Sequence, residues 1–351
     1  MYTTSPFNGV HRFYESLSRA EDLAVSDVRL NGHFGQKCLP NGQASLNGGV
    51  KRLVQEPLVS ILMPVYNEEE YICEALQSVI DQSYERFELI IIDDGSTDAT
   101  PRLIKENFAD RRIRLLSPGK SGKNTAFNYG FAQSTGDWIA FFAGDDVMPK
   151  DSLGSRVASI RNFDALQQKI AATGRLRTFS RIPRFNGHVL PRANKGNFSG
   201  GCVLFSRRMA ELAFPLPETL PNEDSWTGLV IDNFADQVVV IPDIVLNYRI
   251  HENNSNSLLE PFPIKNVSVH RRNAVYQLFL GQFYNSLDDR KRRELVEIVR
   301  AEQLRSGGQV WALMKCSISL ASKLRFLSYS NKYFYYLKTR FYSVLSGWGS
   351  L

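Results

Sequence analysis

Two pairs of adjacent aspartates have a spacing that could support chemistry. Asp145 and Asp146 follow the apolar run 138–142, and Asp93 and Asp94 follow the mostly apolar run 87–92. Neighbouring carboxylates repel each other, so something should compensate them, and a divalent cation is the obvious candidate. Hard ions such as Mg²⁺ and Mn²⁺ take oxygen ligands and often share them with the phosphates of a substrate. A solvated turn would account for either pair taken alone, because aspartate is common in turns.

The segments around these pairs alternate between short apolar runs and helical patterns. Strands are expected at 58–66, 87–93, 113–117 and 138–142, and helices at 67–83, 101–108 and 123–134. This alternation predicts an α/β fold, with a mostly parallel sheet and helices on both of its faces. In such sheets ligands bind at the carboxyl ends of the strands.

Three of the expected strands end in polar groups at that edge of the sheet. The residues are Pro64, Tyr66, Asn67 and Glu68 after the first strand, Asp93 and Asp94 after the second, and Asp145 and Asp146 after the fourth. Asn67 is also expected to cap the helix that follows it. Three strand ends with carboxylates or amides are harder to explain as turns than one, so the sequence predicts a site here.

The composition is that of an ordinary globular protein, with 43% apolar and 22% charged residues among 351. The four cysteines lie far apart, in no metal-binding or disulfide spacing, which favours a reduced, cytosolic setting. No N-terminal segment has the order of a signal peptide, and no window approaches the length of a membrane span. We therefore expect a cytoplasmic protein without a transmembrane helix.

The positive charge is concentrated in the C-terminal part of the chain. Residues 271–351 hold 14 Lys+Arg and 5 Asp+Glu, a balance of +9, against −3 for the remainder and +6 for the whole chain. No acidic residue follows Gln303, and nine aromatic residues lie between Phe326 and Trp348. Cations interleaved with aromatic residues suit an anionic membrane interface. Helices packed on the rest of the protein, with solvated cations, would give the same composition.

Five stretches occur in an order typical of one enzyme family. They are "SILMPVYNEEEYICEALQSVIDQSYERFELIIIDDGSTDAT", "SGKNTAFNYGFAQSTGDWIAFFAGDDVMP", "NFSGGCVLFSRR", "NEDSWTGLVI" and "LNYRIHENNSNS". Together they resemble the family 2 glycosyltransferases, which have the Rossmann-like GT-A fold. Each stretch alone is weak, but five in the right order are strong. The resemblance covers about residues 57–257.

The resemblance implies a site for a nucleotide-sugar donor, most simply a UDP-sugar, with Mn²⁺ or Mg²⁺ as cofactor. The implied donor-binding residues are Pro64, Tyr66, Asn67, Glu68, Asp93, Asp94, Lys123, Asn128 and Asp145. The implied metal ligands are Asp145, Asp146 and His251. A divalent ion would act there as a Lewis acid on the diphosphate leaving group.

Two positions depart from the family pattern. Ala143 stands where many members carry the first aspartate of the metal motif, which leaves open which aspartate holds the ion. Phe127 stands where many relatives place an arginine, so one charge contact to the donor is missing from the pattern.

The resemblance also implies an acceptor side. Asp224 is expected to be the general base, near the start of a helix whose dipole would lower its pKa. Glu223 would bind the acceptor or orient the loop, and Gly200 and Gly201 would let the backbone approach a ligand closely. A helix-starting acid and a tight turn are the plain structural alternatives for these residues.

The chain is expected to divide into three parts. Residues 1–56 form a poorly ordered N-terminal extension, 57–260 a GT-A catalytic domain, and 261–351 a basic, aromatic-rich helical region. We expect peripheral membrane contact through 303–351, at the inner face of the plasma membrane. No nucleic-acid-binding module is present, and no nucleic-acid partner is expected.

The sequence thus predicts an inverting hexosyltransferase-type enzyme that works by metal-assisted single displacement. Its acceptor would be a carbohydrate or lipid-linked hydroxyl, in the synthesis of a cell-surface polysaccharide or glycolipid. Two alternatives stay open: an inactive GT-A-like protein that only binds or scaffolds, and a polyprenyl-phosphate glycosyl synthase.

Overall fold

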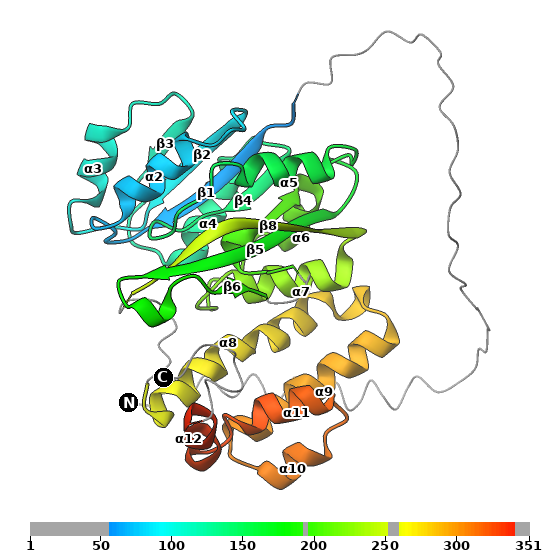
Figure 1. Ribbon diagram of the computed structural model, residues 1–351. Helices are drawn as coiled ribbons and strands as arrows, with labels where there is room; N and C mark the ends of the chain where they lie inside the picture. The colour runs from blue at the N-terminus through cyan, green and yellow to red at the C-terminus, as the bar shows by residue number, and fades with distance from the viewer. Residues whose placement is uncertain (1–55, 192–195, 252–259, 341–351) are drawn as a thin grey trace, which may run out of the picture. The chain divides into compact units, whose positions relative to one another are not determined.

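The computed structural model describes residues 56–191, 196–251 and 260–340. The expected extension 1–56 lies outside these ranges, apart from its last residue. The described part contains an eight-stranded sheet, with helices on its faces and a series of helices after residue 261 (Figure 1).

The first half of the sheet is parallel, as the alternating pattern predicts. Its strands are β1 (Val59–Val65), β2 (Phe87–Asp93), β3 (Ile113–Leu116) and β4 (Trp138–Phe141), in the spatial order β3-β2-β1-β4. The helices between them are α2 (Ile72–Ile80), α3 (Thr100–Asn107) and α4 (Lys123–Ala132). Strands β1 and β2 are almost wholly buried, because helices cover both faces of the sheet.

The second half of the sheet is mixed. Strand β7 (Val203–Ser206) pairs antiparallel with β4 and with β5 (Ile170–Ser180), and β5 in turn pairs with β6 (Val189–Leu190) and β8 (Gln237–Ile250). The helices of this half are α5 (Ser152–Ile160), α6 (Arg207–Ala213) and α7 (Asp224–Phe234). The expectation of a mostly parallel sheet between two helical layers is confirmed.

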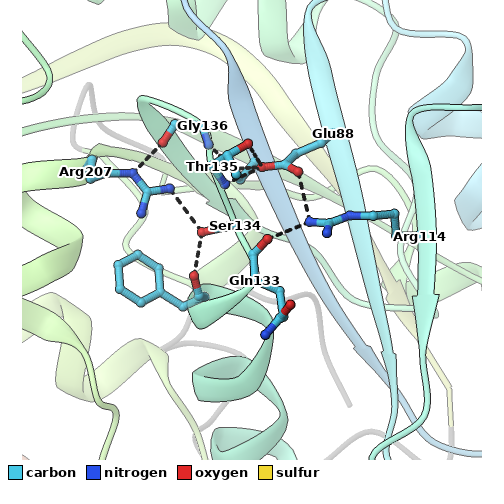
Figure 2. Close-up of polar contacts among 9 residues, drawn as sticks. Glu88, Arg114, Gln133, Ser134, Thr135, Gly136 and Arg207 are labelled. Atoms are coloured by element: carbon cyan, nitrogen blue, oxygen red, sulfur yellow. Dashed lines mark hydrogen bonds and ion pairs between the residues drawn. The ribbon is translucent and has the colours of Figure 1, made fainter.

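A polar network ties together the edge of the sheet at which β2, β3 and β4 begin (Figure 2). The Glu88 carboxylate accepts hydrogen bonds from the Ser60 hydroxyl at 2.7 Å and the Thr135 backbone N–H at 2.6 Å. Arg114 lies 3.0 Å from Glu88, and Arg207 donates to the carbonyl of Gly136 at 2.7 Å. This edge lies opposite the carboxyl ends of the parallel strands.

The C-terminal region is helical, as predicted. It consists of α8 (Phe262–Phe283), α9 (Asp289–Ser306), α10 (Val310–Lys315), α11 (Leu320–Leu327) and α12 (Lys332–Arg340). Aromatic rings join it to α7: Trp226 lies 5.8 Å from Phe279, and Phe234 lies 4.9 Å from Phe283, between ring centroids. Among the described residues no helix is long and apolar enough to cross a membrane.

Candidate active site

The end of β1 is locked to the loop that follows β2. The side chain of Asn67 accepts a hydrogen bond from the Thr97 N–H at 2.8 Å, and its own N–H donates to Ser96 at 3.0 Å. Asn67 has φ 55°, a left-handed conformation that asparagine tolerates well. The expectation that Asn67 caps the following helix is therefore wrong, because α2 begins only at Ile72. The Asn67 side chain is instead hydrogen-bonded to the loop that follows β2.

The aspartate pair at the end of β2 is held by hydrogen-bond donors. Asp93 accepts from the Ser96 N–H at 2.9 Å, and Asp94 accepts from the N–H groups of Ser121 and Gly122 at 2.6 and 2.8 Å. Burial alone would raise the pKa of Asp94, but these donors and the adjacent Lys120 bring it below its ordinary value. Asp94 is thus a stable anion at the strand end.

Tyr66 stands exposed beside this pair. Its ring is 45% exposed, and the Lys120 ammonium lies 3.1 Å above the ring centroid. An aromatic face and a cation next to two ordered carboxylates can stack a base and bind ribose hydroxyls.

The second aspartate pair contacts the end of β8. Asp145 Oδ2 lies 3.0 Å from His251 Nε2, and Asp146 accepts a hydrogen bond from the Arg249 N–H at 2.9 Å. The Arg249 guanidinium also donates to the Asp145 carbonyl at 2.6 Å. Burial and the neighbouring Asp145 raise the pKa of Asp146 well above its ordinary value.

The donor set of this pair fits a metal that is shared with a substrate. Within the described ranges, no group of three or more His, Cys, Asp or Glu side chains is placed to hold an ion. Asp145 and His251 already lie together, whereas Asp146 is buried and engaged with the backbone of Arg249. Mg²⁺ commonly takes one or two carboxylates plus phosphates and water, so two protein ligands suffice.

Glu68 lies against the turn that carries the second pair. A Cβ on Gly144 would lie 3.0 Å from the Glu68 side chain and 3.1 Å from that of Val65, so these two side chains occupy the space beside the glycine. Burial and the charge of Asp145 raise the pKa of Glu68 to about 7. Glu68 can therefore bind or release a proton near neutral pH.

Glu223 immediately precedes helix α7, and Asp224 is the first residue of that helix. Glu223 also contacts helix α4. Lys123 Nζ lies 2.9 Å from Glu223 Oε2. Burial acts to lower the pKa of Lys123, but Glu223, and beyond it Asp224 and Asp145, raise it above its ordinary value. One ammonium thus lies among carboxylates from both halves of the sheet.

Asp224 differs from the sequence expectation in its electrostatics. Its carboxylate accepts hydrogen bonds from the Ser225 N–H at 2.6 Å and from the Asn222 side chain. The expected lowering of its pKa by the helix dipole is wrong: burial and the charge of Glu223 raise the pKa of Asp224. A raised pKa brings a carboxylate closer to the range in which a general base works best.

Gly200 and Gly201 form a 3₁₀ turn, η2 (Gly200–Cys202), directly before β7. A Cβ on Gly200 would lie 2.6 Å from Glu223 Oε1, and one on Gly201 would lie 2.9 Å from Leu246. The space left by these glycines is therefore taken by side chains of the protein itself.

Two asparagines of α4, one turn apart, hold the segment that leads to Glu223. The Asn124 amide donates to the carbonyls of Pro217 and Leu220 at 2.8 and 3.2 Å. The Asn128 amide donates to the Leu216 carbonyl at 3.0 Å and accepts from its N–H at 2.7 Å. Because both polar atoms of Asn128 are engaged, its predicted contact with the donor would require these bonds to break.

Sequence reasoning gave Arg249 and Asn124 no part in the site. Arg249 lies between the rings of Tyr71 and Phe179, 4.6 and 4.4 Å from their centroids. Arg249 lies two residues before His251 at the end of β8, a spacing that could have identified the arginine from the sequence. Phe127, the departure from the family pattern, is buried against Phe141 in the core.

A cavity of about 600 Å³ opens beside His251. Its lining includes Tyr71, Glu74, Phe179, Arg181 and Arg249. This volume lies within the usual range for a small-molecule site, and its aromatic and charged walls suit a polar ligand.

The sheet order, with its helices on both faces, is that of the GT-A fold, and solved structures show the same fold. The chain is similar to S. aureus TarS 1–349 in complex with UDP-GlcNAc, with 17% identity, a TM-score of 0.54, and coverage of 80% of this chain and 83% of that one. It is also similar to the mannosyltransferase PcManGT from Pyrobaculum calidifontis in complex with GDP-Man and Mn²⁺, with 16% identity, a TM-score of 0.50, and coverage of 84% and 81%.

Sequence comparisons point to the same family. The model of glycosyl transferase family 2 matches residues 60–213. An uncharacterized glycosyltransferase of Haemophilus influenzae is 42% identical over 99 residues, which cover 28% of this chain and 40% of that protein. The putative glycosyltransferase EpsH of Bacillus subtilis is 29% identical over 219 residues, covering 56% and 62%. The matches thus span less than two thirds of either relative.

Proposed function

We propose that this protein is an inverting glycosyltransferase, which moves a sugar from a nucleotide diphosphate to an acceptor hydroxyl by single displacement. The observation that carries this proposal is the ion pair between Lys123 and Glu223, with Asp224 beside it. It brings an acid pair of α7 to the same edge of the sheet as Asp145 and His251. This arrangement supports an acceptor-side base and a diphosphate-side charge site that act on one donor molecule.

On the donor side, the exposed ring of Tyr66 and the ordered carboxylates of Asp93 and Asp94 would hold the nucleoside. Pro64 and Asn67 would maintain the backbone conformation at the end of β1. The cation of Lys123 would offset charge on the diphosphate. Asp145 and His251 would hold a divalent ion, with Asp146 behind them; such an ion supplies Lewis-acid stabilisation of the leaving group. UDP is the favoured nucleotide, since TarS binds UDP-GlcNAc.

On the acceptor side, Asp224 would take the proton of the attacking hydroxyl. Its raised pKa makes the carboxylate a stronger base than an exposed aspartate. Glu223, fixed by Lys123 and packed against Gly200, would keep Asp224 oriented and bind the acceptor. With one base and a departing diphosphate on the opposite side, the anomeric configuration inverts without a covalent intermediate.

The experiment is a donor screen. The full-length protein is mixed with UDP-, GDP-, dTDP- and CMP-sugars, with Mn²⁺ or Mg²⁺ or with chelator, and released nucleotide is measured. We expect metal-dependent release from one donor, which is lost in Asp145→Ala and in Asp224→Asn but kept in Asp232→Asn, a control on the same helix. If donor binding by calorimetry is also absent across the panel, the transferase proposal fails and the inactive scaffold replaces it.

The remaining alternative is a polyprenyl-phosphate glycosyl synthase. In that enzyme the acceptor oxygen belongs to a phosphate, which needs little help from a base at neutral pH. Full dependence of transfer on Asp224 would therefore favour a hydroxyl acceptor, and transfer to a polyprenyl phosphate by Asp224→Asn would favour the synthase.

We propose further that residues 303–351, the last part of the helical region 261–351, contact a membrane surface. Large apolar side chains are exposed on several of its helices, among them Trp311 at 84%, Leu320 at 69% and Tyr333 at 75%. Cations such as Lys323 and Lys332 stand beside them. This pattern suits the inner face of the plasma membrane, where a surface polysaccharide or glycolipid is built.

Flotation with phosphatidylcholine and phosphatidylserine vesicles tests this part. We expect binding that requires the anionic lipid and weakens in Trp311→Ser. Equal recovery of the protein with and without vesicles would contradict it.

A further inference from the structure

Arg156 of helix α5 is a wholly buried cation, and among the described residues it has no acidic partner. Its hydrogen-bond acceptors are uncharged. Nε donates to the Ser152 carbonyl at 3.1 Å, Nη2 to the Ser152 hydroxyl at 2.9 Å, and Nη1 to the Gly201 carbonyl in a long bond of 3.4 Å. Burial lowers the pKa of Arg156 to about 10, so the side chain stays charged at neutral pH. A buried charge without an ionic partner destabilises a fold, so packing alone does not account for an arginine here.

The bonds of Arg156 join three segments of the chain. The Ser152 hydroxyl, which accepts from Nη2, itself donates to the Val245 carbonyl of β8 at 2.6 Å. Gly201 belongs to the turn η2, and a Cβ on this glycine would lie 2.9 Å from Leu246, the next residue of β8. The guanidinium therefore connects α5, β8 and the glycine turn.

The same turn contacts the acid pair of the proposed acceptor side. A Cβ on Gly200 would lie 2.6 Å from Glu223 Oε1, so the turn packs directly against this carboxylate. Lys123 lies 2.9 Å from Oε2, the other oxygen of Glu223. Burial and the charge of Glu223 raise the pKa of Asp224, the next residue. A movement of the turn would therefore shift Glu223 and change the electrostatic environment of Asp224.

We propose that Arg156 is a positioning residue, which holds the Gly200–Gly201 turn against Glu223 and so orients the acid pair toward the acceptor. This inference rests on the proposed transferase function, because it deepens the same site. A guanidinium suits this task, since its planar group offers several donors in fixed directions. A hydrogen bond from a charged donor is also stronger than one between neutral groups. The glycines allow the close approach to Glu223, and Arg156 keeps the turn in that position.

Cys202, the last residue of η2, reports on the turn without any catalysis. Its side chain is wholly buried, and burial raises the pKa of its thiol to about 12. The charge of Arg156 acts to lower that pKa, so loss of the charge alone would make the thiol less reactive. Faster labelling of Cys202 in a variant of Arg156 would therefore come from opening of the turn.

The first experiment labels the folded full chain with N-ethylmaleimide and follows each cysteine by peptide mass spectrometry. We expect Cys202 to react at least about 10-fold faster in Arg156→Met, which keeps an unbranched apolar stem and removes the charged donors. Cys316, buried in the helical region, should react at the parent's rate, which excludes general unfolding. Arg156→Lys keeps the charge but offers one nitrogen in place of three, so it should give a smaller increase. If Arg156→Met does not fold, Arg156→Lys carries the same test.

The second experiment measures sugar transfer by the same variants. We expect kcat of Arg156→Met to fall by about 10-fold while donor KM stays nearly unchanged, because the acid pair is misplaced and the donor residues are not. Arg207→Met is the matched control. Arg207 donates to the Gly136 carbonyl at 2.7 Å and to the Ser134 hydroxyl at 3.1 Å, at the opposite edge of the sheet (Figure 2). Its variant should keep the parent's kcat and the parent's labelling of Cys202.

Parent-like labelling of Cys202 in both variants of Arg156 would overturn the proposal, and so would faster labelling with an unchanged kcat. Equal losses of kcat in Arg156→Met and Arg207→Met would also overturn it, because they would reflect a general loss of stability. The labelling needs no substrate. Failure of the donor screen together with selective labelling of Cys202 would therefore refute the transferase but not the contact between Arg156 and the turn. An active transferase in which Arg156→Met alters neither measurement would refute the positioning role alone.

Discussion

Gly200→Ala should impair catalysis by displacing a side chain of the site, while leaving the stability of the fold nearly unchanged. The new Cβ would lie 2.6 Å from Glu223 Oε1, whereas ordinary contacts of a Cβ begin at about 3.4 Å. The carboxylate must therefore move by about 0.8 Å. Glu223 Oε2 is the atom that pairs with Lys123 at 2.9 Å, so this movement also disturbs the ion pair.

The two effects of Gly200→Ala differ in size. The displaced atom is the end of a flexible side chain, so the melting temperature should stay within about 4 °C of the parent's, the change that corresponds to about 1 kcal/mol. Misplacement of a catalytic group by about 1 Å can cost about 100-fold in rate. We therefore expect kcat for sugar transfer to fall by about 10- to 100-fold, with a much smaller change in donor KM.

The assay is steady-state transfer alongside thermal unfolding. Gly228→Ala is the matched control: it lies on α7 behind Asp224, and its Cβ would meet only Phe198 at 3.9 Å. Glu223→Ala completes a double-mutant cycle. In the Glu223→Ala background, Gly200→Ala should lower kcat only slightly, because the carboxylate that the new Cβ displaces is absent. Full activity of Gly200→Ala, or the same loss with and without Glu223, would refute the reasoning.

Three further outcomes are expected. The acid limb of kcat/KM against pH should lie above the ordinary pKa of an aspartate, because burial and Glu223 raise the pKa of Asp224, and activity is lost as pH falls through that pKa. Lys123→Gln should move this limb to still higher pH, since Lys123 lowers the pKa of Asp224; an unmoved limb would exclude Asp224 as the titrating base. Glu88→Gln should reduce the free energy of unfolding at neutral pH by about 1–3 kcal/mol in denaturant titrations. Burial raises the pKa of Glu88, but hydrogen bonds from Ser60 and Thr135 lower it below 4.5. The stabilisation by the Glu88 carboxylate should therefore be lost as pH falls through that lowered pKa. A parent protein that loses no stability in acid would contradict this role of Glu88. Gly281→Ala, at an open position of α8, should stabilise the protein by about 0.5–1 kcal/mol, and a lower melting temperature would show that the helix is strained there.

The parallel half of the sheet was predictable from sequence because its signal is local. Each strand is a short apolar run that ends in a polar turn, and the edge rule then places Asp93 and Asp145 together. The strand predicted to begin at Phe87 and to end in the aspartate pair corresponds to β2, which ends at Asp93. The antiparallel strand β7 and the long β5–β8 pair lie beyond the alternating segments 58–142, and the sequence analysis assigned no strand to them.

The electrostatics of the site were not predictable in the same way. The helix dipole would lower the pKa of Asp224, but burial and an adjacent carboxylate outweigh it, and both depend on tertiary packing. The conformation of Asn67 likewise follows from the neighbouring loop at 96–97, which the sequence does not place next to it.

The chain order of the site has a consequence for the exchange of parts between related proteins. Apart from His251, the proposed donor residues lie between 64 and 146, and the proposed acceptor acids Glu223 and Asp224 come after residue 200. A chimaera joined between these segments would combine the donor preference of one parent with the acceptor preference of the other. The contacts that must match across the joint include Lys123 with Glu223 and the amides of Asn124 and Asn128 with the backbone of 216–220. They also include Asp145 with His251, Asp146 with Arg249, and the pairing of β4 with β7. Recombination could therefore change what is glycosylated without changing which sugar is supplied.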